Sequence, residues 1–247
     1  MSVRPEVLAL IPARGGSKSI PRKNLLRIAG RPLIAYSIEH ALASRHITRV
    51  IVSTDDIEIA EVARAHGAEV PFMRPAEFAQ DQSTDLEVFR HALTALKADQ
   101  GYTCECVVHL RPTGPVRLVA RVDEAIELFL HHPEADSLRS VTWPEQTPYK
   151  MWRQRDGYLE PLLRIEGTPE PYCQPRQQLP EVLWQNGYVD IVRPRAILEL
   201  GLMCGHRILP FVMHEPVLEL DYPETIATIE AALTAGLPPV RGTRHPA

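Results

Sequence analysis

Residues 9–24 read Ala-Leu-Ile-Pro-Ala-Arg-Gly-Gly-Ser-Lys-Ser-Ile-Pro-Arg-Lys-Asn, so an apolar strand runs directly into a basic loop. Gly15 and Gly16 allow the backbone to turn and bring its N–H groups close to an anion. The cations that would neutralise phosphate oxygens in such a site are Arg14, Lys18, Arg22 and Lys23. The stretch lacks both the Walker A spacing and Gly-x-Gly-x-x-Gly, so it predicts a polyphosphate site of another kind, or else a basic turn after the first strand.

Apolar runs and helical patterns alternate along most of the chain. We expect strands at 7–11, 50–53, 69–72, 106–110, 137–141, 188–192, 208–212 and 217–220. We expect helices at 33–44, 57–66, 86–97, 120–131, 195–200 and 223–234. This order predicts an α/β fold with a doubly wound, mostly parallel sheet, whose ligands bind at the carboxyl ends of the strands.

Residues 143–186 interrupt this alternation with Pro, Gln, Tyr, Trp and Arg. An irregular segment of that length inside a compact domain is usually functional, and we expect a lid over the sheet or a dimer-contact arm. The sequence therefore predicts an α/β core formed by residues 1–142 and 187–236, with an inserted substrate or dimerisation excursion at 143–186. Residues 237–247, rich in Pro, Gly and Arg, are predicted to form a flexible tail.

The composition excludes several classes of partner. A formal net charge of −4 in 247 residues argues against nucleic acid and anionic membrane surfaces as partners. No apolar run of about 18 residues could span a bilayer and no secretory h-region is present, so we expect a cytoplasmic protein. The four cysteines form no Cys-x-x-Cys pair and the ten histidines show no ligand spacing, so we expect neither zinc nor a disulfide.

The basic loop resembles the N-terminal signature of the cytidylyltransferases that activate acylneuraminate and related nine-carbon sugar acids. In that family the pattern is Pro-Ala-Arg-Gly-Gly-Ser-Lys-Gly-Ile-Pro-Arg-Lys-Asn, and this chain differs only at Ser19. Further blocks follow in order over roughly residues 5–235, which makes a chance match improbable. The resemblance implies a Rossmann-like nucleotidyltransferase fold, a homodimer, and transfer of CMP from CTP to a nonulosonic, sialic-acid-like sugar acid with release of pyrophosphate.

The resemblance implies a nucleotide site built on the loop. Arg14, Lys18 and Lys23 would be catalytic cations that stabilise the departing pyrophosphate. The block that runs from Arg74 to Asp81 would border the base; without the resemblance, Arg74 reads as a surface ion-pair residue. The implied nucleotide-binding residues are Ala13, Arg14, Gly15, Gly16, Ser17, Lys18, Lys23, Asn24, Arg74 and Asp81. From its position alone, Asp56 is predicted to cap a helix, with Asp55 as a weak candidate for nucleotide contact.

The block Leu-Arg-Pro-Thr-Gly-Pro-Val-Arg at 110–117 matches the family's Leu-Gln-Pro-Thr-Ser-Pro-Leu-Arg with two departures that bear on the acceptor. Arg111 replaces a glutamine that contacts the sugar acid, and Gly114 replaces a serine. A guanidinium carries a permanent charge and a fork of donors, so we expect an acceptor that is more anionic or binds differently. The implied acceptor residues are Arg111, Thr113, Lys150, Arg176 and Asn186, although Lys150 reads equally as a solvated surface residue.

Glu219 and Asp221 would share one face of the strand expected at 217–220, because strand side chains alternate. They fall where the family has Asp-x-Asp. Two carboxylates together with triphosphate oxygens suit Mg²⁺, so the resemblance implies Asp221 as a catalytic and metal residue and Glu219 as a second metal ligand. The alternative is a solvated strand face.

Two other functions stay open at this point. Arg111 and Gly114 are compatible with a CTP- or GTP-dependent enzyme whose acceptor is a sugar 1-phosphate or a phosphonate. Ser19 and Glu219, which replace family residues, are compatible with a catalytically silent nucleotide-binding protein. Release of pyrophosphate in the presence of Mg²⁺ separates an enzyme from a binder, and a panel of acceptors separates the two enzymes.

Overall fold

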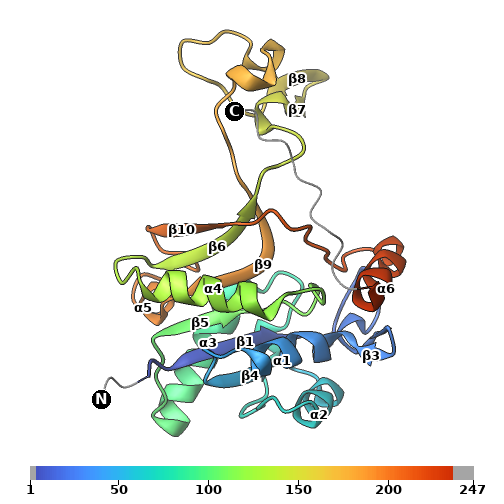
Figure 1. Cartoon of the computed structure of the whole chain (residues 1–247), viewed down its shortest axis with the longest axis vertical. Coiled ribbons are helices and arrows are strands. Elements are labelled where there is room, and N and C mark those ends of the chain that lie inside the picture. The colour runs from blue at the N-terminus through green and yellow to red at the C-terminus, as the bar shows by residue number, and fades with distance from the viewer. Residues whose placement is uncertain (1–3, 236–247) are drawn as a thin grey trace.

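A computed structural model describes residues 4–235, which form an α/β core and a projecting arm (Figure 1). The strands of the central sheet are β1 (Val7–Pro12), β4 (Arg49–Ser53), β5 (Cys106–His109), β6 (Ser137–Thr142), β9 (Trp184–Val192) and β10 (Ile208–Val212). Their order across the sheet is β10-β6-β9-β5-β1-β4. Of these six strands, β9 alone runs antiparallel to its neighbours, so the sheet is mostly parallel.

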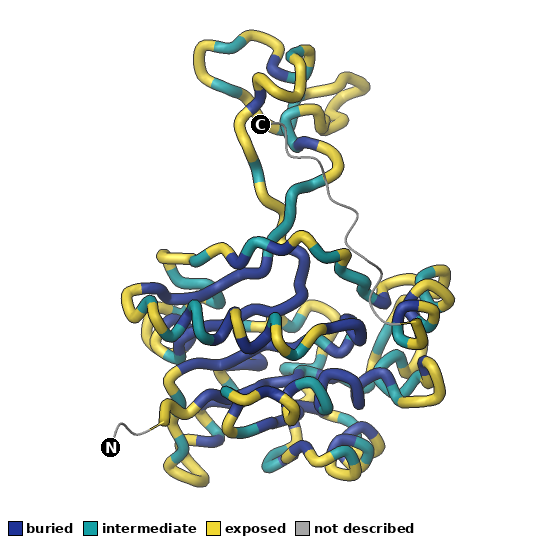
Figure 2. Tube along the Cα trace, in the orientation of Figure 1, coloured by how far each residue is buried: buried dark blue, intermediate teal, exposed yellow. Residues whose placement is uncertain are grey.

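Helices cover both faces of this sheet. One face carries α1 (Leu33–Ala43), α2 (Ile57–Ala65) and α4 (Val119–Leu130), and the other carries α3 (Asp85–Gln100) and α5 (Pro194–Leu198). Alternate residues of β1 pack into the two hydrophobic clusters: Val7, Ala9 and Ile11 face the first, whereas Leu8 and Leu10 face the second. A strand buried on both faces reads as a continuous apolar run, which is why β1 is apolar throughout. Figure 2 shows the resulting buried centre.

Two helices that border the carboxyl edge of the sheet have well-defined ends. The side chain of Asp56 accepts a hydrogen bond from the Ile59 N–H at the start of α2, as its predicted capping role requires. Thr84 and Glu87 form a capping box at the start of α3, which ends at Gly101 with a φ of 63°. These caps fix the two loops that precede the helices.

Two predicted strands do not form. At 69–72, Glu69 makes a single bridge to Ile51, and Pro71 has no N–H with which to extend a ladder. At 217–220 the chain lies beside a loop instead of a strand, and the Leu220 N–H donates to the carbonyl of Thr113 at 2.7 Å. The last predicted helix begins with a 3-10 turn, η6 (Pro223–Thr225), and continues as α6 (Ile226–Ala235).

The remaining elements are short. The basic loop is followed by η1 (Lys23–Leu25) and by the ribbon of β2 (Arg27–Ile28) and β3 (Arg31–Pro32), beside which α6 packs. A 3-10 turn, η2 (Ala76–Phe78), lies before α3. None of the helices between residues 4 and 235 is long and apolar enough to cross a membrane. The predicted tail, 237–247, lies outside the described residues.

The segment after β6 forms an arm, residues 143–183, that extends away from the sheet (Figure 1). It contains a hairpin of β7 (Trp152–Arg155) and β8 (Tyr158–Pro161) and the turns η3 (Pro148–Lys150), η4 (Pro171–Cys173) and η5 (Arg176–Gln178). Most of the arm is exposed (Figure 2). Within one chain, therefore, the arm does not lie over the sheet as a lid would.

Candidate active site

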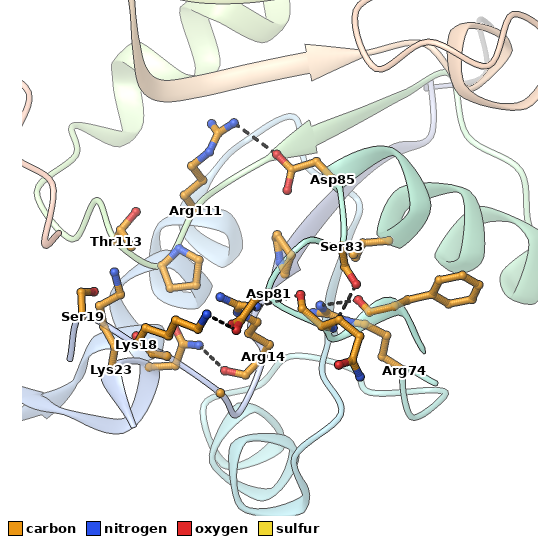
Figure 3. Close-up of a pocket in the computed structure, with 18 of the residues that line it drawn as sticks. Arg14, Lys18, Ser19, Lys23, Arg74, Asp81, Ser83, Asp85, Arg111 and Thr113 are labelled. Carbon is orange, nitrogen blue, oxygen red and sulfur yellow. Dashed lines mark hydrogen bonds and ion pairs between the residues drawn. The ribbon is translucent and has the colours of Figure 1, made fainter. Parts of the chain in front are cut away.

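A cavity of about 480 Å³ opens at the carboxyl ends of β1 and β5. The basic loop forms one wall, the segment around η2 forms the opposite wall, and the ends of β5 and α3 complete it (Figure 3). The predicted site residues that line it are Arg14, Gly16, Ser17, Lys18, Lys23, Asn24, Arg74, Asp81, Arg111 and Thr113. We call it the phosphate cavity.

A second cavity, of about 490 Å³, adjoins the first. It is lined by Arg111, Thr113, Trp184, Gln185, Asn186, Gly187, Glu219 and Asp221, and we call it the acidic cavity. Arg111 and Thr113 line both cavities. The two spaces are therefore halves of one cleft that meet at the end of β5.

The two glycines of the basic loop differ in their surroundings. The Gly15 N–H donates to Asp55 Oδ1 at 3.0 Å, so in this structure it is not free to bind an anion. Asp55 thus holds the backbone of the loop at Gly15. A Cβ at Gly15 would lie 2.6 Å from Asp56 Oδ2, which explains glycine at that position. A Cβ at Gly16 would meet nothing within 4 Å, so its backbone stays open to the cavity.

Two cations of the basic loop, Arg14 and Lys18, contact Asp81 in the phosphate cavity. Arg14 Nη1 donates to the Gln80 carbonyl at 2.8 Å and lies 3.2 Å from Asp81 Oδ1, while Lys18 Nζ lies 2.5 Å from Asp81 Oδ2 (Figure 3). The hydrogen bond from Lys18 lowers the pKa of Asp81. Asp81 therefore occupies, across the cavity, the position in which an anionic ligand would be held.

Lys23 reaches the junction of the two cavities, whereas Arg22 does not. Lys23 is mostly buried; its Nζ donates to the Leu220 carbonyl at 3.0 Å and lies 3.6 Å from Asp221 Oδ1. Arg22 forms ion pairs with Asp56, at 2.6 Å, and with Glu58, and it lines neither cavity. Arg22 therefore anchors the loop to the start of α2, although the sequence grouped it with the phosphate-binding cations.

Arg74 is buried and ties η2 to β4. Its guanidinium donates to the hydroxyl and the carbonyl of Ser53, at 3.1 Å to the hydroxyl, and to the Phe78 carbonyl at 3.4 Å. Burial lowers its pKa to about 10. The interpretation as a surface ion-pair residue is therefore wrong, and Arg74 shapes the wall of the phosphate cavity.

Two other predicted nucleotide residues also build the loop. The Ala13 N–H donates to the Ser53 carbonyl at 3.0 Å, and the Ala13 side chain is buried away from both cavities. Asn24 Nδ2 donates to the Arg14 carbonyl at 2.9 Å. Both residues hold the backbone of the loop against its neighbours.

Glu219 and Asp221 flank the buried Leu220 and line the acidic cavity together. The two side chains lie at the same cavity, as predicted, although residues 217–220 form no strand. Burial, followed by the negative charge of Asp221, raises the pKa of Glu219. Gly187 has a φ of +69°, and a Cβ at this position would lie 2.5 Å from Glu219 Oε1. Glycine at 187 therefore leaves room for the Glu219 carboxylate. The pair concentrates negative charge at the end of the cleft, where Lys23 lies near Asp221 but the structure gives Glu219 no ion pair among the described residues.

The predicted acceptor residues divide into two groups. Arg111, Thr113 and Asn186 line the acidic cavity. Lys150 and Arg176 lie on the arm and line neither cavity. Arg176 donates to the carbonyls of Pro144 and Glu145, at 2.9 and 3.1 Å, so it joins η5 to the segment with which the arm begins.

Gly114, one of the two departures from the family pattern, has a packing reason. A Cβ there would lie 2.8 Å from Arg117 Nη2. Arg117 is buried and donates to the carbonyls of Tyr188, Arg111 and Gly114 and to the Ser37 hydroxyl. Burial lowers its pKa to about 10. Arg117 thus holds the loop after β5 in place and takes the space that a side chain at Gly114 would need.

Sequence reasoning missed three residues around Arg111: Asp85 and His109 line the phosphate cavity, and Asp190 forms an ion pair with Arg111. His109 is buried, and neither ring nitrogen has a hydrogen-bond partner among the described residues. Burial, reinforced by Arg111, holds the pKa of His109 well below its ordinary value, so the ring is neutral. A usable signal was present, because Asp190 interrupts the apolar run of the strand predicted at 188–192.

Comparisons with known proteins identify the family of this chain. A family model described as Cytidylyltransferase matches residues 8–127. Post-translational flagellin modification protein B from Campylobacter coli is 30% identical over 225 residues, which cover 88% of this chain and 92% of that protein. The chain belongs to the cytidylyltransferase family. The predicted family is confirmed.

Another member of the family, pseudaminic acid cytidylyltransferase from Campylobacter jejuni, is 41% identical over 125 residues. That alignment covers 51% of this chain and 53% of the relative, so this cytidylyltransferase chain spans about half the length of that relative. The solved structure of CMP:2-keto-3-deoxy-manno-octonic acid synthetase complexed with CTP matches with a TM-score of 0.68 and 17% identity, covering 94% of this chain and 100% of that one. The predicted α/β fold is confirmed.

Proposed function

We propose that this protein transfers CMP from CTP to a nonulosonic, sialic-acid-like sugar acid and releases pyrophosphate. The observation that carries the proposal is the two-part cleft, in which a cationic half and an acidic half meet at Arg111 and Thr113. Reaction between a polyphosphate and a second substrate needs such a junction. The name of the Campylobacter jejuni relative, pseudaminic acid cytidylyltransferase, supports a sugar acid as acceptor.

The phosphate cavity would hold CTP. Arg14, Lys18 and Lys23 would bind the triphosphate, displacing the contacts that Asp81 makes with two of them. The acceptor hydroxyl would form a bond to the α-phosphorus while the bond to the bridging oxygen breaks, pyrophosphate leaves and the hydroxyl proton passes to solvent. Fixed cations stabilise the charge that develops on the departing oxygens, so no covalent protein intermediate is needed.

The acidic cavity would hold the acceptor. Asn186 Oδ1 accepts a hydrogen bond from the Tyr188 N–H at 3.2 Å, and its buried Nδ2 has no partner within residues 4–235. A buried amide group without a partner at a cavity wall is a ready donor for a ligand oxygen. A sugar phosphate suits this cavity less well, because Glu219 and Asp221 would repel a dianion.

The acidic pair also suits Mg²⁺, and we include this ion in the proposal. The described part of the chain has no group of three or more His, Cys, Asp or Glu arranged to hold a metal. Mg²⁺ is commonly bound by only one or two carboxylates plus substrate phosphates. Burial and the neighbouring charge of Asp221 raise the pKa of Glu219, so a cation bound between the two carboxylates would relieve their repulsion. Asp221 and Glu219 would hold the ion. When bound, it would neutralise charge on the phosphates.

We further propose a homodimer in the cytoplasm, formed through the arm. The arm exposes many large apolar side chains for its size: Met151, Trp152, Tyr158, Leu159, Leu163 and Leu183. Apolar groups gathered on a projecting element are typical of an interface. In their own chain the exposed Lys150 and Arg176 line neither cavity. Contact with a second subunit would bring them close to the cleft of that subunit.

The test is release of pyrophosphate from CTP or GTP, with Mg²⁺, in the presence of N-acetylneuraminic, pseudaminic or N,N′-diacetyllegionaminic acid. Mass spectrometry of the product identifies the nucleotide and the acceptor. We expect a CMP adduct of a sugar acid and no adduct with GTP. Binding of CTP without pyrophosphate from any acid would indicate a silent binder, and turnover of a sugar 1-phosphate alone would indicate the other enzyme class.

A further inference from the structure

We propose that Asp190 is a positioning residue that fixes the Arg111 guanidinium at the junction of the two cavities, where it acts as a directional donor to the acceptor. The inference rests on the proposed function for the identity of the acceptor. It rests on the geometry of the buried charges for the role of Asp190. Nothing in the sequence pattern of the family blocks pointed to this residue.

Asp190 lies in the middle of the sheet. On β9 it pairs with His109 of β5 on one side and with Arg139 of β6 on the other. Its side chain is buried, with 3% of its surface exposed. One oxygen, Oδ2, lies 2.5 Å from Arg111 Nη1 and 2.5 Å from Arg139 Nη1. The carboxylate therefore joins an arginine at the cavity wall to an arginine deeper in the sheet.

Arg111 has a second, weaker partner. Its Nη2 lies 3.5 Å from Asp85 Oδ2 at the start of α3, and Asp85 is about half exposed (Figure 3). Exposed ion pairs contribute little because water and salt screen them, whereas a buried pair at short range is screened much less. Asp190 therefore determines where the guanidinium sits, and Asp85 adjusts it.

This arrangement changes the expected role of Arg111. Asp190 and Asp85 together offset its positive charge, so Arg111 does not create a net positive site for an additional anionic group of the acceptor. A guanidinium has five N–H donors in a rigid plane, and two contacts leave others for a ligand. The side chain is 24% exposed and lines both cavities. Arg111 thus offers donors of fixed direction, and an acceptor of ordinary charge is sufficient.

A double-mutant cycle tests whether Asp190 acts through Arg111. We would measure acceptor KM, CTP KM and kcat for Asp190→Asn, Arg111→Gln and the double variant, using the sugar acid that the wild type turns over best. Each single variant is expected to raise acceptor KM about tenfold and to leave CTP KM within about twofold, and the double variant should match Arg111→Gln. Effects that simply add, or a rise in CTP KM, would overturn the proposal.

Arg139→Gln is the matched control, because Arg139 contacts Asp190 but lines neither cavity. Its melting temperature is expected to fall while its acceptor KM stays within about threefold of wild type. A rise as large as that of Asp190→Asn would mean that any disturbance of the buried charges has the same effect, and the positioning role would be wrong.

Two measurements keep the proposal testable if Asp190→Asn folds poorly or if no sugar acid is turned over. Arg111→Lys keeps the charge but not the fork, so acceptor KM should rise about tenfold, and an unchanged KM would contradict a directional role. A crystal structure of Asp190→Asn should show the guanidinium displaced from the junction. An unmoved guanidinium overturns the proposal even when the proposed function holds, and failure of all sugar acids overturns the proposed function even when the guanidinium moves.

Discussion

The cleft and the arm place their charged residues in opposite ways. In the cleft, cations of the basic loop meet carboxylates from separate segments: Arg14 and Lys18 lie beside Asp81, and Lys23 lies beside Asp221. In the arm, Lys150 is exposed and Arg176 binds the arm's own backbone. The carboxyl edge of a doubly wound sheet brings distant segments together within one chain. A projecting arm can do so only against another surface.

The largest expected effect tests the cleft itself. Lys23→Ala removes a mostly buried cation at the junction, and Arg14→Ala removes one opposite Asp81. Each should lower kcat/KM by about 10² or more, because charge develops on pyrophosphate beside them. Pyrophosphate release at varied CTP concentration measures this.

The control for both variants is Arg22→Ala. Arg22 belongs to the same loop but pairs with Asp56 and Glu58 outside both cavities. Its kcat/KM should stay within about threefold of wild type, the scale of an exposed ion pair. Equal losses in all three variants would mean that the loop responds only to its total charge and that the cleft geometry is irrelevant.

The next effect compares the two carboxylates of the acidic cavity. Asp221→Asn should lower kcat by about 10 to 10²-fold and Glu219→Gln by less, because Asp221 also lies near Lys23 and keeps the residue type of the family pattern. Excess Mg²⁺ or Mn²⁺ should partly restore Asp221→Asn. Metal titrations that are superimposable for wild type and both variants would show that neither carboxylate binds the ion.

The sequence predicted the parts of the molecule that depend on local order. Alternating apolar runs located the six strands of the sheet, and the Gly-Gly stretch located the wall of the phosphate cavity. What it could not give were the contacts between distant residues. Arg22 and Lys23 are adjacent and chemically alike, and only the positions of Asp56 and Asp221 separate their roles.

The same limit explains the errors at the end of the chain and in the arm. Residues 217–220 alternate as a strand would, but their neighbour is the Thr113 loop, so no ladder forms. Arg176 matches a family block that predicts contact with the acceptor. In the structure its guanidinium donates instead to the carbonyls of residues 144 and 145. Asp190 carried a polar signal in an apolar strand, but its partners Arg111 and Arg139 come from two other strands.

A smaller effect tests whether the arm needs a second subunit. Replacing Tyr158 and Leu159 by glutamate puts charge on exposed apolar positions of the hairpin that no other part of residues 4–235 covers. We expect a monomer by analytical ultracentrifugation and a rise in acceptor KM of about tenfold or less, with CTP KM unchanged. A monomeric wild type, or a monomeric variant with normal acceptor KM, would remove the arm from the site.

The smallest expected effect concerns stability. It compares how a carboxylate in the cleft and a carboxylate in the arm affect the melting temperature. Burial and Asp221 raise the pKa of Glu219 above its ordinary 4.5, so folding favours the protonated form. This contribution is fully present below the ordinary pKa and is lost as pH rises through the raised value, where ionised Glu219 costs stability. Glu219→Gln should therefore melt about 1–3 °C higher than wild type near neutral pH, without Mg²⁺, and the gain should vanish near pH 4. Glu160→Gln, on the exposed hairpin strand β8, should show no such gain. If Glu219→Gln instead melts at or below wild type at neutral pH, the ionised Glu219 carboxylate has a stabilising partner in the folded protein, and its burial in the cleft does not set it apart from the exposed carboxylate of the arm.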